Sequence, residues 1–477
     1  MGEPIPFGSA QKSGFDVETG AGPAAFNVYT DARGAVRRRP GITTYAEAPT
    51  GVVDARGIDG LFVTDEGRIL AVSGAGNVTQ RALYEIDGGA SRKLVGVIPG
   101  NGRAQFAQTD MLVVIATGGQ PIKYVRTDRT AAYLGGAPPP GTHIATGAQR
   151  LLMNDPTQPS AVRFSATAQG LITYAGHEQW TLTNPVTSGQ LGADRRPDPI
   201  VALADSTNDV FAWGAYSLQL FSPDAQFGFA PSGTIELGCV APYSIIKADN
   251  QFFWLDQFRR FVMSDGRSQD DISADIAQTV AQLERVDDCF GYRVSIGNLD
   301  ALVWTFPSAG LTFAYQKSIG WAQWAGYDTN LSRFKVNAHT YRSGAGVSVV
   351  GTSDGRIGQL DLESTTDLGE TVLARSTTGF LDRGTDARKN SKVVRLALRR
   401  GKFTGATGPH AYLSFRDRLG PWQARIPVDL GGSKDTEAVV ELRSLGVYRR
   451  RQWMFEFSGT EELVLARASE EFEVLGQ

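Results

Sequence analysis

The chain contains the segments Gly214-Ala-Tyr-Ser-Leu-Gln-Leu-Phe221, Cys239-Val-Ala-Pro-Tyr-Ser-Ile-Ile246 and Phe252-Phe-Trp-Leu255, and these decide its fold class. Each is an apolar run of strand length, and Gly, Pro, Asp and Asn residues separate it from the next. None of the three shows the 3.6-residue spacing of an amphipathic helix. Because much of the chain has the same texture, the sequence predicts a mainly β protein built from short strands and turns.

Hairpin signals recur along the chain between residues 50 and 365. In one of them, Asp65-Glu-Gly67 separates Gly60-Leu-Phe-Val63 from Ile69-Leu-Ala-Val72, and a short loop with Gly between apolar runs is typical of a hairpin. Repeated hairpins over about 300 residues favour a β-propeller of four-stranded blades over a plain sandwich. At roughly 40–50 residues for each blade, six or seven blades fit this length, and six is favoured.

The sequence also predicts one isolated helix and a change in residue pattern near residue 385. Residues 273 to 286 place Ile276, Val280 and Leu283 on one helical face and begin with Ser273, a residue type that caps helices. Beyond residue 385, alternating strands indicate a separate small antiparallel β unit. The expected domains are an N-terminal arm with the strand that leads into the body (1–45), a propeller body (46–385) and a C-terminal β domain (386–477).

Composition limits the classes of function. Of the 477 residues, 42% are apolar and 20% are charged, so a sizeable core is expected. A net charge of −3, from 47 basic and 50 acidic side chains, gives no general attraction to nucleic acid or to anionic membranes. Two cysteines, Cys239 and Cys289, make a disulfide framework improbable. We expect no secretory leader and no membrane-spanning segment.

The sequence contains no convincing catalytic, cofactor or metal site. The four histidines are widely scattered, and neither a His-Glu-x-x-His motif nor a phosphate-binding loop is present. Asp256 follows an aromatic strand, but it has no evident carboxylate partner for glycoside hydrolysis. We therefore expect no catalytic residues, no cofactor, no bound metal and no enzymatic activity.

Two arginine triplets are the strongest local charge features, and they comprise Arg37, Arg38, Arg39, Arg449, Arg450 and Arg451. Adjacent side chains on a strand alternate between its faces, so at most two of each triplet point the same way. They can be solvated strand ends or members of salt bridges. They can equally contact an acidic partner or the phosphates of DNA, which arginine forks bind well. The six arginines are therefore candidate partner or DNA contacts.

Several segments, taken in order, carry a resemblance to a known family. They are Asn27-Val-Tyr29, Arg38-Arg-Pro-Gly-Ile42, the three segments quoted first, Asp270-Asp-Ile-Ser273, Ala301-Leu-Val-Trp-Thr-Phe-Pro307, Thr312-Phe-Ala-Tyr315 and Gly320-Trp-Ala-Gln-Trp324. Over residues 25 to 360 this order resembles the tail hub or nozzle proteins of short-tailed bacteriophages, often called packaged-DNA-stabilisation proteins. Gln316 departs from the pattern, in which an Asp is usual after Tyr315.

The resemblance implies a structural protein of the virion tail that is assembled in the host cytoplasm. It implies a β-propeller that forms a homo-hexameric ring below the portal and head-to-tail adaptor. Such a ring extends and closes the channel for double-stranded DNA, without sequence specificity, and anchors distal fibre, spike or needle proteins. The alternative is a propeller-type glycan-binding or glycoside-hydrolysing protein, which would need an acidic and arginine cluster at the central mouth of the propeller.

Overall fold

Short strands joined by tight turns make up most of the structure, as predicted. The computed structural model describes residues 2–7, 25–49, 57–73, 81–167, 174–180, 188–192, 198–206, 209–317, 319–326, 332–401, 411–417, 420–431, 436–459 and 462–475. Contacts divide the chain into two units, which are described separately. We call Thr44–Arg293 with Lys335–Gln359 the blade unit, and Met1–Thr43 with Val294–Phe334 and Leu360–Gln477 the sandwich unit.

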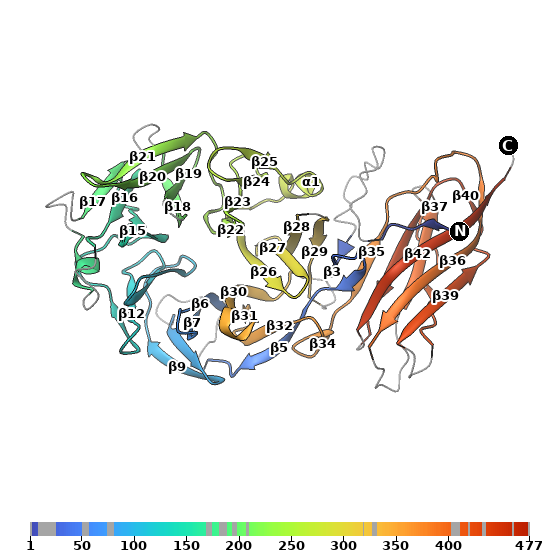
Figure 1. Ribbon diagram of the computed structural model, residues 1–477, viewed down its shortest axis with the longest axis horizontal. Helices are drawn as coiled ribbons and strands as arrows, with labels where there is room; N and C mark the ends of the chain where they lie inside the picture. The colour runs from blue at the N-terminus through green and yellow to red at the C-terminus, as the bar shows by residue number, and fades with distance from the viewer. Residues whose placement is uncertain are drawn as a thin grey trace. The chain divides into compact units, whose positions relative to one another are not determined.

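The blade unit contains five sheets of four antiparallel strands, which follow one another in chain order (Figure 1). The first two are β6 (Ile58–Val63), β7 (Ile69–Ser73), β8 (Leu83–Asp87), β9 (Ala90–Val95), and β10 (Gln105–Gln108), β11 (Leu112–Ala116), β12 (Ile122–Val125), β13 (Thr130–Tyr133). The next three are β14 (Ile144–Gly147), β15 (Arg150–Asn154), β16 (Ala161–Phe164), β17 (Gly189–Gly192); β18 (Ile200–Asp205), β19 (Val210–Gly214), β20 (Leu218–Asp224), β21 (Gly228–Ile235); and β22 (Ile246–Ala248), β23 (Gln251–Leu255), β24 (Phe261–Ser264), β25 (Gln269–Asp271).

A sixth sheet combines strands from distant parts of the chain. Its order is β30 (Val336–Arg342), β31 (Val347–Thr352), β32 (Ile357–Asp361), β5 (Gly41–Ala46), β33 (Thr366–Asp367) and β34 (Glu370–Thr371). One more meander has the same strand order, namely β26 (Phe290–Ile296), β27 (Leu299–Phe306), β28 (Leu311–Gln316) and β29 (Gly320–Gln323). Successive four-stranded antiparallel sheets are the blades of a β-propeller. The predicted fold class, a mainly β protein with a propeller of six or seven blades, is therefore confirmed.

The blades pack face to face, so their strands are apolar on both sides. All five residues of β11 are buried, and this explains the uninterrupted run Leu-Val-Val-Ile-Ala. One buried cluster joins Val72 of the first blade to Val113 of the second, and another joins Phe211 of the fourth to Phe252 of the fifth. A third cluster joins Ile69 of the first blade to β30 and β31 of the sixth sheet, so the end of the blade unit packs against its beginning.

The hairpins predicted from turn chemistry are present. Val63 pairs with Ile69 across the turn that contains Gly67, and this glycine has a φ of 78°. A positive φ is easily adopted only by glycine, so a local sequence signal was enough to place the turn. A second hairpin joins β31 to β32, with Val350 opposite Gly358, and its turn contains Gly355 with a φ of 86°.

The predicted helix over residues 273 to 286 is much shorter in the structure. Among the described residues, α1 (Ala277–Ala281) is the one α-helix, and three short 3-10 helices are η2 (Ala175–Glu178), η3 (Pro242–Ser244) and η4 (Ser343–Ala345). Ser273 does not cap α1: its backbone and hydroxyl bond to Asp271, and it starts a turn that ends at Ile276. The apolar spacing is satisfied by burying Ile276 and Val280, and one helical turn suffices for that.

Two sheets form the rest of the sandwich unit. One has the order β3 (Val28–Thr30), β4 (Val36–Arg38), β42 (Leu463–Val474), β36 (Lys389–Arg400), β39 (Glu437–Arg443), with β1 (Glu3–Pro4) on β42 and β40 (Val447–Tyr448) on β36. The other continues from β29 through β2 (Ala25–Phe26), β35 (Ala374–Thr377), β41 (Arg451–Phe457), β37 (Ala411–Asp417) and β38 (Ile426–Pro427).

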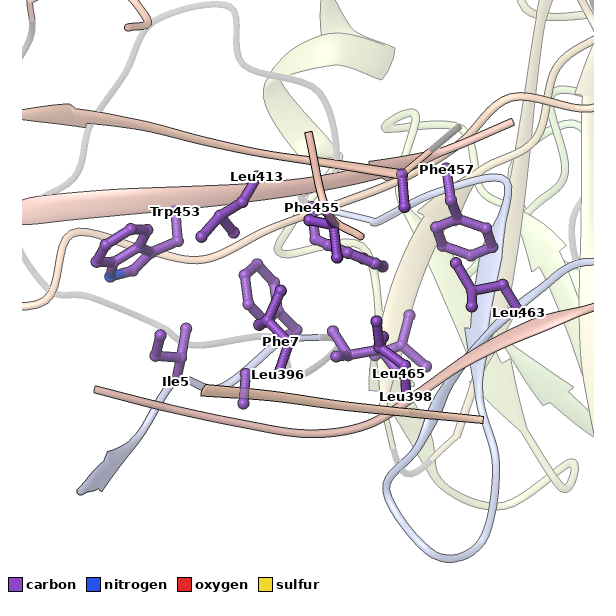
Figure 2. Packing of buried hydrophobic residues seen from close by; sticks show 14 of the residues in the cluster. Ile5, Phe7, Leu396, Leu398, Leu413, Trp453, Phe455, Phe457, Leu463 and Leu465 are labelled. Atoms are coloured by element: carbon purple, nitrogen blue, oxygen red, sulfur yellow. The ribbon is translucent and has the colours of Figure 1, made fainter. Parts of the chain in front are cut away.

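The core of the sandwich unit lies between these two sheets. Figure 2 shows Leu413 and Phe455 on one side and Leu396 and Leu398 on the other, with Phe7 between them. Alternation along each strand sends these side chains inward and polar ones outward. Because Phe7 comes from the N-terminal segment, both ends of the chain contribute to this core.

Candidate functional site

Arg39 of the first arginine triplet is fully buried in the sandwich unit. Its guanidinium binds both carboxylate oxygens of Asp367, at 3.0 and 2.6 Å, and also donates to Asn27 Oδ1 at 2.9 Å and to the carbonyl of Ala325 at 2.7 Å. The ring of Phe334 lies 4.1 Å from its charged carbon. A bidentate, ring-stacked arginine is the type of residue that a buried ion pair requires. Arg39 therefore joins strands far apart in the sequence.

The other two members of this triplet differ in exposure because strand residues alternate between faces. Arg38 is buried and donates to the carbonyls of Thr365 and Gly459, at 3.0 and 2.8 Å. The side chain of Arg37 is 29% exposed and pairs with Asp31 and Glu462, each at 2.9 Å. Burial raises the pKa of Asp31, but the hydrogen bonds from Arg37 and from two backbone amides outweigh it and lower the pKa below its usual value.

The second triplet also has buried and exposed members, but strand alternation is not the cause, because Arg449 and Arg450 precede β41, which begins at Arg451. Arg451 is buried, binds both oxygens of Asp417 at 2.7 and 2.9 Å, and stacks on Phe415 at 4.0 Å. The side chains of Arg449 and Arg450 are 41% and 48% exposed, and Asp386 is the acidic group nearest to both, at 3.6 and 4.0 Å. One carboxylate for two guanidiniums leaves a local excess of positive charge.

The structure does not bring the two triplets together. Arg37 is opposite Val464 near one end of β42, whereas Lys389, whose ammonium donates to the carbonyl of Arg449, is opposite Val474 near the other end. Ten residues of strand separate these positions, which is about 33 Å. Of the six predicted contact residues, Arg37, Arg449 and Arg450 thus present side chains to solvent, in two separate places.

Sequence reasoning did not find the buried polar residues that hold the blade unit together. Arg81 is fully buried, pairs with Asp59 at 3.0 Å and donates to the carbonyls of Gly100 and Gly102. It therefore ties the first blade to the segment that leads into the second. A charged residue inside an apolar blade sequence is the one signal that could have drawn attention to it.

Asp256, considered above as a carboxylate for glycoside hydrolysis, has a structural role. It accepts hydrogen bonds from the backbone amides of Phe258 and Arg260, both at 2.8 Å, and pairs with the guanidinium of Arg260. These bonds order the turn between β23 and β24. In the part of the chain that the structure describes, no group of three or more His, Cys, Asp or Glu residues could hold a metal ion.

His143 lies buried in the blade unit, with its ring stacked on Tyr243 at 4.8 Å between ring centres. Burial lowers the pKa of His143 from 6.5 to about 4. Below pH 6.5, His143 therefore binds a proton in the unfolded chain but stays neutral in the folded chain. The free energy of unfolding falls as the pH falls. Between pH 7.5 and pH 5 this residue should cost about 2 kcal/mol of the free energy of unfolding.

Urea denaturation of the parent and of His143→Phe at both pH values measures this effect. The variant keeps an aromatic ring against Tyr243 but does not titrate, so its pH dependence should be smaller by about 2 kcal/mol. Equal pH dependence in the two proteins would contradict the assignment.

Successive blades with faces packed on each other define a β-propeller protein. The family model described as the bacteriophage P22 Gp10 β-propeller matches residues 23–365. This is more than half of the chain, which therefore belongs to that family of phage tail nozzle and stabilisation proteins. The resemblance stated from the sequence is confirmed, and the chain is a structural component of a phage tail.

Solved structures resemble this chain only weakly. Virginiamycin B lyase from Staphylococcus aureus is 9% identical, with a TM-score of 0.45, and the match covers 67% of this chain and 99% of the lyase. The extracellular domain of a hybrid two-component system from B. thetaiotaomicron is 11% identical, with a TM-score of 0.46, and the match covers 74% of this chain and 42% of that one. Likeness of this size carries no argument about function. A search of the curated proteins found no match.

None of the helices in the described residues has the length and apolar content needed to cross a bilayer.

Proposed function

We propose that this protein forms a homo-hexameric ring in the tail, below the portal and its head-to-tail adaptor. The ring extends the channel for double-stranded DNA, helps to close it after packaging, and anchors distal tail proteins. The observation that carries the proposal is the match of the tail nozzle family over residues 23–365. Assembly would take place in the host cytoplasm.

The physical character of the chain supports a wall rather than a catalyst. Blades with apolar, closely packed cores and buried ion pairs such as Arg81–Asp59 resist deformation. A net charge of −3 suits a conduit, because a strongly basic wall would hold DNA too tightly to release it. In a ring, each charged side chain that faces the channel would occur once for every subunit.

Negative-stain imaging of the protein mixed with the portal–adaptor complex of its phage tests this proposal. We expect a six-fold ring that caps the complex. Subunits that remain monomeric at high concentration and never join the complex would overturn the proposal and favour the glycan-binding alternative. Binding of the protein to host surface glycans would then support that alternative.

Among the six arginines, we propose Arg449 and Arg450 as partner contacts, since both are exposed and share one carboxylate. Replacing both with Glu should weaken docking to the adaptor ring at least tenfold at low salt and less at high salt, because the attraction is screened. The melting temperature should stay within about 2 °C of the parent value, because exposed ion pairs contribute little to stability.

A matched control applies the same change of charge elsewhere in the sandwich unit. Lys392 and Arg467 are also exposed, so Lys392→Glu combined with Arg467→Glu should leave docking within threefold of the parent. If both double variants weaken docking equally, general charge and not this cluster determines the contact. Arg38 and Arg39 are unsuitable for such a test, because their burial makes any acidic substitution a test of folding.

A further inference from the structure

Strand β39 lies at the edge of the seven-stranded sheet of the sandwich unit. One side of it pairs with β36, from Val393 opposite Arg443 to Arg399 opposite Glu437. On its other side no strand of the described residues is paired. An edge strand of seven residues is long enough to recruit another strand, and proteins usually manage such edges by some specific device. The question is what covers this one.

The register shows which backbone groups point away from the sheet. Arg400 N–H donates to the carbonyl of Thr436, and Ser444 N–H donates to that of Lys392, so Thr436 and Ser444 direct their backbone groups toward β36. In antiparallel pairing every second residue does so, and the register of β36 with β39 contains no shift. The backbone groups that face outward therefore belong to the residues between, namely Glu437, Val439, Glu441 and Arg443.

A second β39 can pair with this strand in antiparallel fashion, with Val440 opposite Val440. In this register the four outward residues of one copy lie opposite the four outward residues of the other. Glu437 then lies opposite Arg443 of the second copy, and Val439 lies opposite Glu441. Each of these pairs can exchange two backbone hydrogen bonds, because all its members direct their amides and carbonyls outward. The two Glu437–Arg443 pairs place opposite charges at both ends of the contact, which favours this register.

The same register also covers apolar surface. Val439 is 71% exposed, which is the largest exposed fraction among the large apolar residues of the described chain. On the inner face of the sheet, Val440 and Leu442 are half-buried and pack against the edge of the sandwich core. In the paired arrangement, Val440 meets Val440 of the second copy and Leu442 meets Ala438, so the core continues from one copy into the next. Glu441 forms ion pairs with Arg395 and Arg443, each at 2.7 Å, so in the paired arrangement Arg443 lies between Glu441 of its own strand and Glu437 of the second copy.

We propose that β39 of this chain pairs in antiparallel fashion with β39 of a second copy, with its two-fold axis at Val440. The contact uses the same strand on both copies, so it is separate from the head-to-tail contacts that would close a ring. It joins two copies, or two rings, and covers an edge that would otherwise be open to indiscriminate strand pairing. It does not rest on the proposed function.

Sedimentation of the full chain at rising concentration tests the proposal. We expect two-fold association, as dimers or as paired rings. Glu437→Arg alone places two arginines together at each end and should raise the dissociation constant at least tenfold, and Arg443→Glu alone should do the same. The combined exchange Glu437→Arg with Arg443→Glu restores opposite charges and should return the constant to within threefold of the parent.

A backbone variant gives an independent measurement. Val439→Pro removes an outward N–H without touching the ladder to β36, and edge strands tolerate proline at such positions. Its folded signal by circular dichroism should match that of the parent, while association is lost. Two-fold association that survives Val439→Pro, a combined exchange that fails to rescue, or a parent that never associates in pairs would each overturn the proposal.

Discussion

Arg39→Ala is expected to lower the free energy of unfolding of the sandwich unit by about 3–5 kcal/mol, because it breaks a buried ion pair by removing one partner. The side chain of Asp367 is 1% exposed, so its charge would remain buried without a counterion. Asn27 Oδ1 and the carbonyl of Ala325 would each lose a donor as well. Urea denaturation followed by circular dichroism measures the loss.

Arg37, two residues earlier in the same triplet, provides the matched control. Its pair with Glu462 is solvated, and Asp31, although buried, still accepts hydrogen bonds from the backbone amides of Arg33 and Ala35, so Arg37→Ala should cost only about 1–2 kcal/mol. Replacing Arg39 and Asp367 together with Met and Leu should recover much of the loss, because no uncompensated charge is then left inside. Equal effects of the two alanine variants would show that burial of Arg39 has no energetic consequence.

Trp254→Ala is expected to have an effect of similar size in the blade unit, about 3–5 kcal/mol. The indole is fully buried, lies 5.8 Å from Trp213 in an edge-to-face arrangement, and donates from Nε1 to the carbonyl of Gly238 at 2.9 Å. Its removal leaves a cavity between two blades and a buried carbonyl without its donor. Thermal unfolding monitored by the fluorescence of the remaining tryptophans would show the loss.

Phe258, four residues further along, is the control for this substitution. It is 65% exposed and contacts the guanidinium of Arg260 at 5.1 Å. Phe258→Ala should therefore cost no more than about 1 kcal/mol, the size of an exposed cation–π contact. A larger loss from Phe258→Ala than from Trp254→Ala would mean that the cores between blades are not what stabilises this unit.

Hairpins could be predicted from the sequence because their determinants are local. Gly67, for example, has a positive φ value in a turn that the neighbouring residues alone predicted. The helix expected over residues 273 to 286 was wrong in length because the apolar spacing of Ile276 and Val280 is satisfied by one turn. The amide and hydroxyl of Ser273 donate to Asp271, so Ser273 does not cap the helix. It instead begins a turn that ends at Ile276.

The roles of the arginines could be predicted only in part. Although Arg449 and Arg450 precede β41 and are both exposed, alternation along a strand predicted that the members of a triplet do not all face the same way. It could not show which of them would be enclosed, because Asp367 lies 328 residues from Arg39 in the sequence. In the same way, nothing in the sequence around Arg81 indicated that its partners would be Asp59 and two glycine carbonyls.

Residue types and their order along the chain were sufficient to predict the fold class, the strand and turn content and the family. These depend on residue types and spacings that act within a few residues, or on an ordered set of segments. The tertiary structure decided which strands meet at long range, such as β4 and β36 on β42, and therefore which charges are buried and which edge remains open. A side chain becomes buried only when two surfaces come into contact. The residues of each surface can be read from the sequence, but which two surfaces meet cannot.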